Sequence, residues 1–329
     1  LIWKMTLSIQ YYSFILFTMC FFYIFEIMLK KLNSKQINYD FESRFFLPLL
    51  ILNIASYSFM FINFIIKFGF LNPLKYPFIY ENNLYMPGLT IIYRSIIPLF
   101  IYSVYKILYG RSSKKVYYFT VIYSFVTLFI KFNKTDIVIL LLIVIIFVYN
   151  KYFAQSITFK NKAKALIIIG LLSVVFVFYF ISFYTKIFKD DVIINNQIIL
   201  YTSGGQLYLD YILQNDIWAR FEYFNFFKVF SGYINPERIF LESISTNVYG
   251  LFGDIFNDFY YYGIIIGPFI INVLIYIFNK LTKNNIIGFV FLAAYFTLAF
   301  FGSYILLSGF WIQVFYLILL SRTSKNIID

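Results

Sequence analysis

The stretch FFLPLLILNIASYSFMFINFII, residues 45–66, decides the fold class of this chain. It carries no charged residue, and as a helix it is long enough to cross a hydrocarbon layer, which takes about 20 apolar residues. The whole chain has the same character: of its 329 residues, 61% are hydrophobic, 24% are aromatic and only 13% are charged. Soluble domains carry roughly twice that share of charged residues. The sequence therefore predicts an all-α polytopic integral membrane protein.

Nine apolar runs are predicted to be transmembrane helices, and the sixth and seventh are separated by one large extracytoplasmic loop. The runs are residues 10–29, 45–66, 87–109, 116–131, 135–150, 165–185, 259–279, 286–301 and 304–320. This predicts three parts: an N-terminal bundle of six spans (1–185), the large loop (186–258), and C-terminal spans with a cytoplasmic tail (259–329). Because residue 1 is Leu, we expect either a misread start or missing upstream helices.

The distribution of charge predicts the orientation of the chain. Lys and Arg are concentrated in alternate loops, and such loops are cytoplasmic under the positive-inside rule. These segments are residues 30–44, 106–115, 151–164, 280–285 and the tail after 320. The large loop carries a formal charge of −4, whereas the rest of the chain carries +16. The net charge of +12 is therefore attributed to basic loops at anionic lipid and not to nucleic acid binding.

Missing residue types exclude several classes of site. The chain has no histidine, which removes Ser-His-Asp triads, Cys-His pairs and zinc sites of the HExxH type. Its single cysteine, Cys20, rules out a disulfide framework and a Cys-rich metal site. Neither GxGxxG nor GxxxxGK[ST] occurs, so dinucleotide and P-loop sites have no support. Any chemistry must therefore use carboxylates, Arg, Lys and electrostatics.

A group of cations near the predicted outer face indicates an anionic ligand such as a diphosphate. Arg94 lies about seven residues inside the third span, where a charge usually faces a cavity or a partner, although snorkelling to the interface is the alternative. Arg220 and Arg238 lie in the large loop. Lys131 and Lys134 lie in KFNKTD, between the fourth and fifth spans, where a lysine beside a helix N-terminus suits a phosphate, unless this is an ordinary polar turn.

Two carboxylates precede the seventh span. Asp254 and Asp258 are four residues apart and would share one face of a helix. Paired carboxylates act as a general base or as a metal site. The alternative is that they are acids at a helix N-terminus, where they stabilise the helix dipole.

The segment NVYGLFGDIFNDFYYYG, residues 247–263, resembles the Wzy-type oligosaccharide repeat-unit polymerases of O-antigen and capsule synthesis. That family tends to show Asn-Val-Tyr, then Asp-Phe-Gly, and a further Gly that opens the next span. Asn247, Val248, Tyr249, Asp258, Phe259 and Gly263 match this pattern, whereas Tyr260 replaces the first of its glycines. The segments 201–213 and KFNKTD are similar to two further elements of the family, with Lys134 in the basic position.

The resemblance implies a glycosyltransferase that needs neither a metal nor a cofactor. It would join undecaprenyl-diphosphate-linked oligosaccharide repeat units at the outer leaflet of the bacterial cytoplasmic membrane. Arg94, Lys134, Arg220 and Arg238 would hold the diphosphate, and Asp254 or Asp258 would activate the acceptor. Membrane lipid, a chain-length regulator and a flippase are the implied partners. The alternatives are a lipid-linked oligosaccharide flippase and an O-antigen ligase-like transferase, although family ligases usually have a His in the outer loop and this chain has none.

Overall fold

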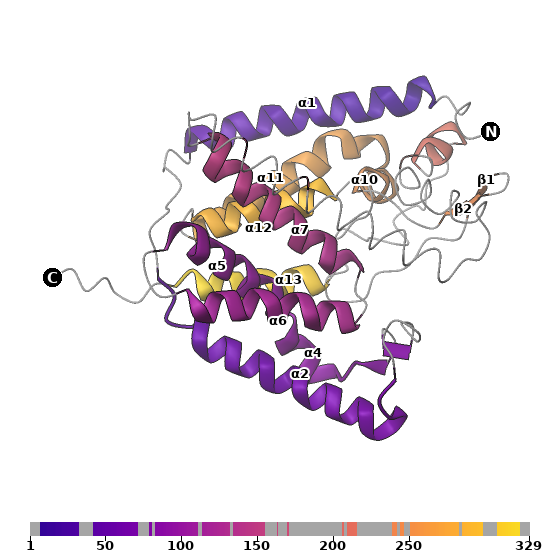
Figure 1. The fold of residues 1–329 in the computed structure, drawn as a ribbon. Helices are drawn as coiled ribbons and strands as arrows, with labels where there is room; N and C mark the ends of the chain where they lie inside the picture. Colours follow the sequence, from indigo (N-terminus) through magenta and orange to yellow (C-terminus); the bar gives the residue numbers. More distant parts are fainter. Residues whose placement is uncertain are drawn as a thin grey trace. The chain divides into compact units, whose positions relative to one another are not determined.

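The structure is a computed structural model in which nearly every described residue is helical (Figure 1). The helices are α1 (Ile9–Leu32), α2 (Phe46–Phe68), α4 (Pro87–Tyr93), α5 (Ile96–Tyr109), α6 (Lys115–Lys131), α7 (Lys134–Tyr149), α10 (Leu251–Phe259), α11 (Gly263–Leu281), α12 (Ile286–Thr297) and α13 (Ser308–Leu320). The residues that it describes are 7–32, 42–71, 79–80, 83–110, 114–131, 134–154, 163, 170, 206, 209–215, 239–241, 244–246, 251–282, 285–298 and 308–322.

The helices follow the predicted apolar runs closely, with the third run divided between α4 and α5. Within the described part of the chain, five helical stretches are long and apolar enough to cross a membrane: 9–28, 46–68, 87–109, 135–152 and 260–281. The chain is therefore a helical membrane protein, as its composition predicts. The predicted span at 165–185 lies almost wholly outside the described residues, and the number of nine spans stays a prediction.

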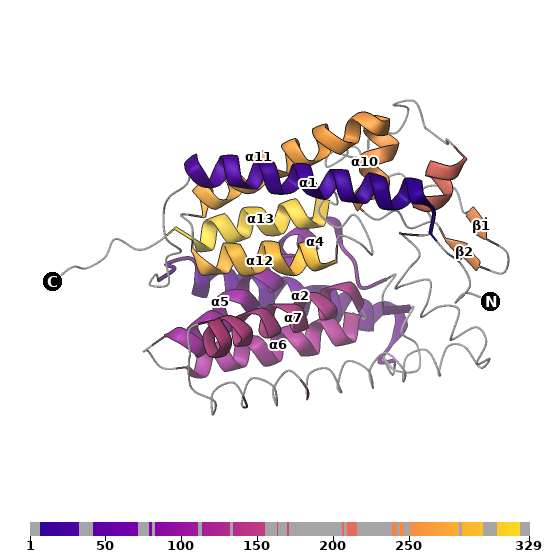
Figure 2. The same cartoon turned by 90° about the horizontal axis from the view of Figure 1, so that it is seen from above.

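One compact unit consists of residues 37–177, 279–294 and 312–329, and α5 is its central helix. Helices α2, α6 and α7 pack against α5, and α4 packs against α2 (Figures 1 and 2). Every residue of α5 from Ile96 to Lys106 is buried. On α2, by contrast, large apolar side chains such as Ile51, Phe59 and Ile66 are exposed. In a membrane protein such an apolar surface faces lipid, which needs no polar covering.

Basic residues gather at the C-terminal end of α5. Lys106 is buried and pairs with Glu42, with 3.1 Å between Nζ and Oε1. Lys114 Nζ donates to the Ile107 carbonyl oxygen at 2.7 Å, and Lys151 Nζ donates to the Leu108 carbonyl oxygen. Lysines suit this position because the last carbonyls of a helix lack partners and carry partial negative charge. Three loops that the charge pattern assigns to the cytoplasmic side thus supply residues to one end of this unit.

The other compact unit consists of residues 1–36, 178–278 and 295–311. Within it, α1 packs along α10 and α11 through pairs of aromatic rings (Figures 1 and 2). The pairs are Phe14 with Phe256, Phe22 with Phe252, and Phe25 with Phe269. The predicted boundaries at 185 and 258 describe membrane topology and not packing, so they stay predictions beside these two units.

Helices α10 and α11 form a tight corner. A Cβ on Gly263 would lie 2.6 Å from the backbone oxygen of Ile255, and a Cβ on Gly267 would lie 2.8 Å from the Ile255 side chain. Only glycine allows such an approach. The link between the helices is a short 3-10 turn, Tyr260–Tyr262, and Tyr260 has a φ of 52°, in the left-handed region that non-glycine residues rarely adopt.

One small sheet departs from the predicted all-helical fold. Strands β1 (Ile239–Leu241) and β2 (Ile244–Thr246) pair antiparallel, with Phe240 opposite Ser245. They lie in the predicted outer loop and are rich in β-branched Ile and Thr, which favour extended backbone.

Candidate functional site

A break in the third apolar run positions Arg94. Helix α4 ends at Tyr93 and α5 begins at Ile96, so Arg94 and Ser95 lie between them. Pro98 explains the break, because it lacks the N–H that would bond to the Arg94 carbonyl and because its ring crowds that carbonyl. The third run is therefore two short helices end to end, and Arg94 lies where they meet.

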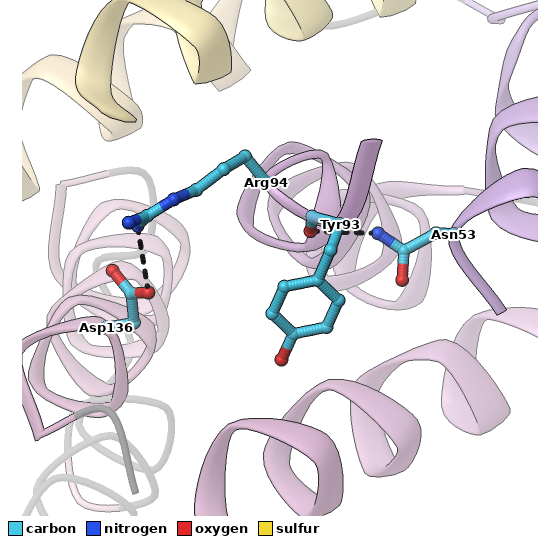
Figure 3. Close-up of polar contacts among 4 residues, drawn as sticks. All are labelled: Asn53, Tyr93, Arg94 and Asp136. Atoms are coloured by element: carbon cyan, nitrogen blue, oxygen red, sulfur yellow. Dashed lines mark hydrogen bonds and ion pairs between the residues drawn. The ribbon is translucent and has the colours of Figure 1, made fainter. Parts of the chain in front are cut away.

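Asn53 of α2 holds the two sides of this break together. Its Nδ2 donates to the Tyr93 carbonyl oxygen at 3.0 Å (Figure 3). The same Nδ2 donates to Ser95 Oγ at 2.9 Å, and Oδ1 accepts from the Tyr123 hydroxyl at 3.0 Å. Asn53 is fully buried. Backbone groups freed by a broken helix must find partners inside the protein, because the lipid offers none. The Asn53 side chain supplies one.

Arg94 reaches from the break to the first turn of α7, where it meets Asp136 (Figure 3). Arg94 Nη1 and Asp136 Oδ2 are 3.5 Å apart. The Arg94 side chain is 32% exposed, whereas that of Asp136 is 8% exposed. A tight charge-assisted hydrogen bond would be ~2.7–2.9 Å long. The pair is therefore loose, and about a third of the Arg94 side chain remains accessible.

Lys131, the last residue of α6, adds a second cation to this site. Its Nζ lies 4.8 Å from the centre of the Tyr93 ring, a cation–π distance. It also interacts electrostatically with both Arg94 and Asp136. Only 9% of the residue is exposed. Tyr93, Arg94, Lys131 and Asp136 are together called the Arg94 cluster below.

The Arg94 cluster has one more positive charge than negative charge. Its hydrogen-bonding groups are also incompletely used within the described part of the chain. There, the buried Tyr93 hydroxyl has no hydrogen-bond partner, and Lys131 Nζ contacts the Tyr93 ring. Thr127 lies near that hydroxyl, and its Oγ1 donates to the backbone oxygen of Tyr123 at 2.9 Å. A site with surplus charge and unused donors, shielded from water, suits an anion.

Two of the four cations predicted to bind the diphosphate, Arg94 and Lys134, lie on or between helices that the structure describes. Arg94 and Lys134 come near each other along the fold, because Lys134 begins α7, two residues before the Asp136 that Arg94 contacts. The Lys134 side chain is outside what the structure describes, as are Arg220 and Arg238 in full. Of the four cations predicted to hold the diphosphate, the structure therefore describes Arg94 and the backbone of Lys134.

The predicted pair of carboxylates lies in α10, within the other unit. Asp254 and Asp258 are both fully buried. Asp254 is in the first turn of α10, where a carboxylate stabilises the helix dipole. Asp258 is near the C-terminal end of the same helix, where the dipole disfavours an anion. The helix-dipole alternative therefore accounts for Asp254 but not for Asp258.

Two members of the Arg94 cluster were not identified from the sequence, namely Asp136 and Tyr93. Asp136 follows KFNKT directly and was included in a polar turn, although an acid at the start of an apolar run is a signal of its own. Tyr93 is one of 32 tyrosines and carries no distinguishing pattern.

Comparisons with protein-family models, with curated proteins and with solved structures find no match for this chain.

Proposed function

We propose that this chain is a polysaccharide polymerase, a glycosyltransferase that joins undecaprenyl-diphosphate-linked oligosaccharide repeat units at the outer leaflet of the bacterial cytoplasmic membrane. The observation that carries the proposal is the Arg94 cluster. It places surplus positive charge and a partly exposed guanidinium between apolar helices, at the end of α6 and α7 that the charge pattern assigns to the outer side. This is the chemistry needed to hold a lipid-linked diphosphate.

The proposed reaction needs no nucleotide or cofactor. The bond between the anomeric carbon of the donor glycan and its diphosphate oxygen breaks, and a hydroxyl oxygen of the acceptor sugar bonds to that carbon. The diphosphate leaves with the electron pair of the broken bond, and the hydroxyl proton passes to a base. Arg94, Lys131 and Lys134 would stabilise the charge that grows on the leaving diphosphate. The sequence offers Asp258 or Asp254 as the carboxylate for this base.

The corner between α10 and α11 also supports the resemblance to the polymerase family. Tyr260 stands where the family pattern has a glycine, and its φ of 52° is a conformation that glycine adopts without strain. Gly263, which matches the next glycine of the pattern, begins α11 at a close approach of the two helices. A matching backbone requirement at both positions is more specific than a match of residue letters.

A lipid-linked oligosaccharide flippase is the second candidate. The break at Arg94 favours it, because transporters commonly bind anionic groups where a membrane helix is interrupted. Both candidates handle the same diphosphate-linked lipid. They differ in the product that accumulates when the protein is absent.

Deleting the gene and separating the surface glycan on a gel distinguishes the two candidates. A polymerase mutant keeps glycan with a single repeat unit and loses the longer ladder, whereas a flippase mutant loses both. Complementation with Arg94→Gln should restore little polymer, because the diphosphate would lose its main donor. Complementation with Arg44→Gln, which changes an arginine of a predicted cytoplasmic segment, should restore the ladder. An unchanged ladder in the deletion strain would refute both functions.

A further inference from the structure

The Arg94 cluster contains an anion of its own, and the geometry points to a function for it. We propose that Asp136 is a resident counter-ion that occupies Arg94 until a diphosphate group binds and takes Arg94 from it. The inference rests on the proposed function only in naming a lipid as the carrier of that diphosphate. Asp136 would thereby limit how tightly the site holds its ligand.

The contact between Arg94 and Asp136 has the form expected of an exchangeable pair. The carboxylate is buried and held in the first turn of α7, so it stays in place when Arg94 moves. The guanidinium is the more exposed partner, and its contact with Asp136, at 3.5 Å, is longer than a strong ion pair. The bond to Asp136 is also the one hydrogen bond that the Arg94 side chain makes to a described residue. The other guanidinium N–H groups make no hydrogen bond to a described residue, so they can donate to a ligand.

Lys131 and Tyr93 explain why a phosphate group would compete successfully with Asp136. Across the described residues, the Tyr93 hydroxyl has no hydrogen-bond partner and Lys131 Nζ contacts the face of the Tyr93 ring, and both residues are more than nine-tenths buried. A diphosphate offers several charged oxygens, whereas the Asp136 carboxylate offers two, and one already faces Arg94. The ligand would therefore satisfy donors that Asp136 leaves unused, and this gain would offset the loss of the resident pair.

A counter-ion inside the site also has a consequence for turnover. A transferase must release the diphosphate lipid after each transfer, and a site with only cations would retain it. The repulsion between Asp136 and the bound anion raises the free energy of the bound state. Asp136 would thus trade affinity for faster release, which favours an enzyme or transporter that works repeatedly.

The test is the binding of inorganic pyrophosphate to the purified full chain in detergent, measured by calorimetry. Asp136→Asn should bind pyrophosphate about tenfold to a hundredfold more tightly than the wild type, because a like charge within several ångströms has been removed. Glu42→Gln removes the anion of the Lys106 pair in the same unit and should leave the affinity unchanged. Weaker or unchanged binding by Asp136→Asn would overturn the proposal, because Asp136 would then be a support for Arg94.

A second variant tests the site if Asp136→Asn fails to fold. Lys131→Met keeps the apolar stem of the side chain and removes its charge, so pyrophosphate affinity should fall about tenfold. Unchanged affinity in Lys131→Met would also overturn the proposal. Repeating the titration with detergent micelles that contain undecaprenyl diphosphate separates the two ligand sources, because a lipid ligand should bind more tightly than pyrophosphate and compete with it.

These outcomes are distinguishable from failure of the proposed function. If Asp136→Asn tightens pyrophosphate binding and deletion of the gene leaves the glycan ladder intact, the counter-ion stands and the polymerase does not. If the ladder collapses to a single repeat unit while Asp136→Asn weakens binding, the polymerase stands and the counter-ion does not.

Discussion

Replacing Asn53 by leucine should destabilise the protein more than any other polar-to-apolar change on α2. Leucine has a similar size but donates and accepts no hydrogen bond. The change removes three side-chain hydrogen bonds: to the Tyr93 carbonyl oxygen at 3.0 Å, to Ser95 Oγ at 2.9 Å, and from the Tyr123 hydroxyl at 3.0 Å. The Tyr123 hydroxyl keeps only its 3.4 Å contact with the backbone oxygen of residue 53. The loss therefore falls on both sides of the helix break and on α6.

The magnitude follows from the three contacts. Each buried group that loses its partner costs ~1–3 kcal/mol in a soluble protein. Hydrogen bonds between membrane helices average about 0.6 kcal/mol in double-mutant cycles, with a maximum near 1.7. Three contacts made by a fully buried side chain therefore give a loss of about 2–4 kcal/mol. A titration with sodium dodecyl sulfate, followed by circular dichroism, measures this change in the free energy of unfolding.

Two controls make the result decisive. Asn63, half-buried on the same helix, makes no hydrogen bond to a residue that the structure describes, so Asn63→Leu should change stability by less than about 0.5 kcal/mol. Tyr123→Phe should cost about 1 kcal/mol alone and less in the presence of Asn53→Leu, because both changes remove the same bond. Equal stabilities of Asn53→Leu and Asn63→Leu would refute the claim that Asn53 holds the break.

Three further changes test particular contacts. Gly263→Ala should abolish folded protein in detergent, because its Cβ would meet a backbone oxygen of α10 at 2.6 Å, whereas Gly88→Ala, with nothing within 4 Å, should express normally. Tyr260→Gly should be about 1 kcal/mol more stable than Tyr260→Ala, since φ is 52° there, and the reverse order would refute a left-handed conformation. Glu42→Gln should cost about 1 kcal/mol in a detergent titration, because Lys106 stays buried while its partner is 69% exposed; a stability equal to wild type would show the pair to be inert.

The membrane helices were largely predictable from the order of residues. Runs such as 45–66 are so apolar that only lipid or a buried core can accommodate them, and their lengths match a bilayer. The structure places α2 at Phe46–Phe68, within two residues of that prediction. The internal break of the third run was not predicted, although Pro98 is its cause. A proline is tolerated in membrane helices when other groups satisfy the freed backbone, and the sequence does not reveal which groups do so.

The candidate site was predicted only in part. Arg94 was identified because a charge inside an apolar span is costly and requires a reason. Lys134 was identified from its place at the start of the next span. Their assignment to one site depended on the antiparallel arrangement of α5, α6 and α7, which sequence alone indicates only through loop charge. Arg220 and Arg238 stay predictions, as do the roles of Asp254 and Asp258.

The sequence by itself determined that this chain is a helical membrane protein, because no water-soluble arrangement could bury so much apolar surface. It also determined that these 329 residues supply no histidine to a site. Only the tertiary structure decided which charges meet. Arg94 and Asp136 are separated by 42 residues, and Lys131 meets the Tyr93 ring across a similar interval. Contacts of that range depend on how the helices pack, and helix packing is set by the shapes of all facing side chains together.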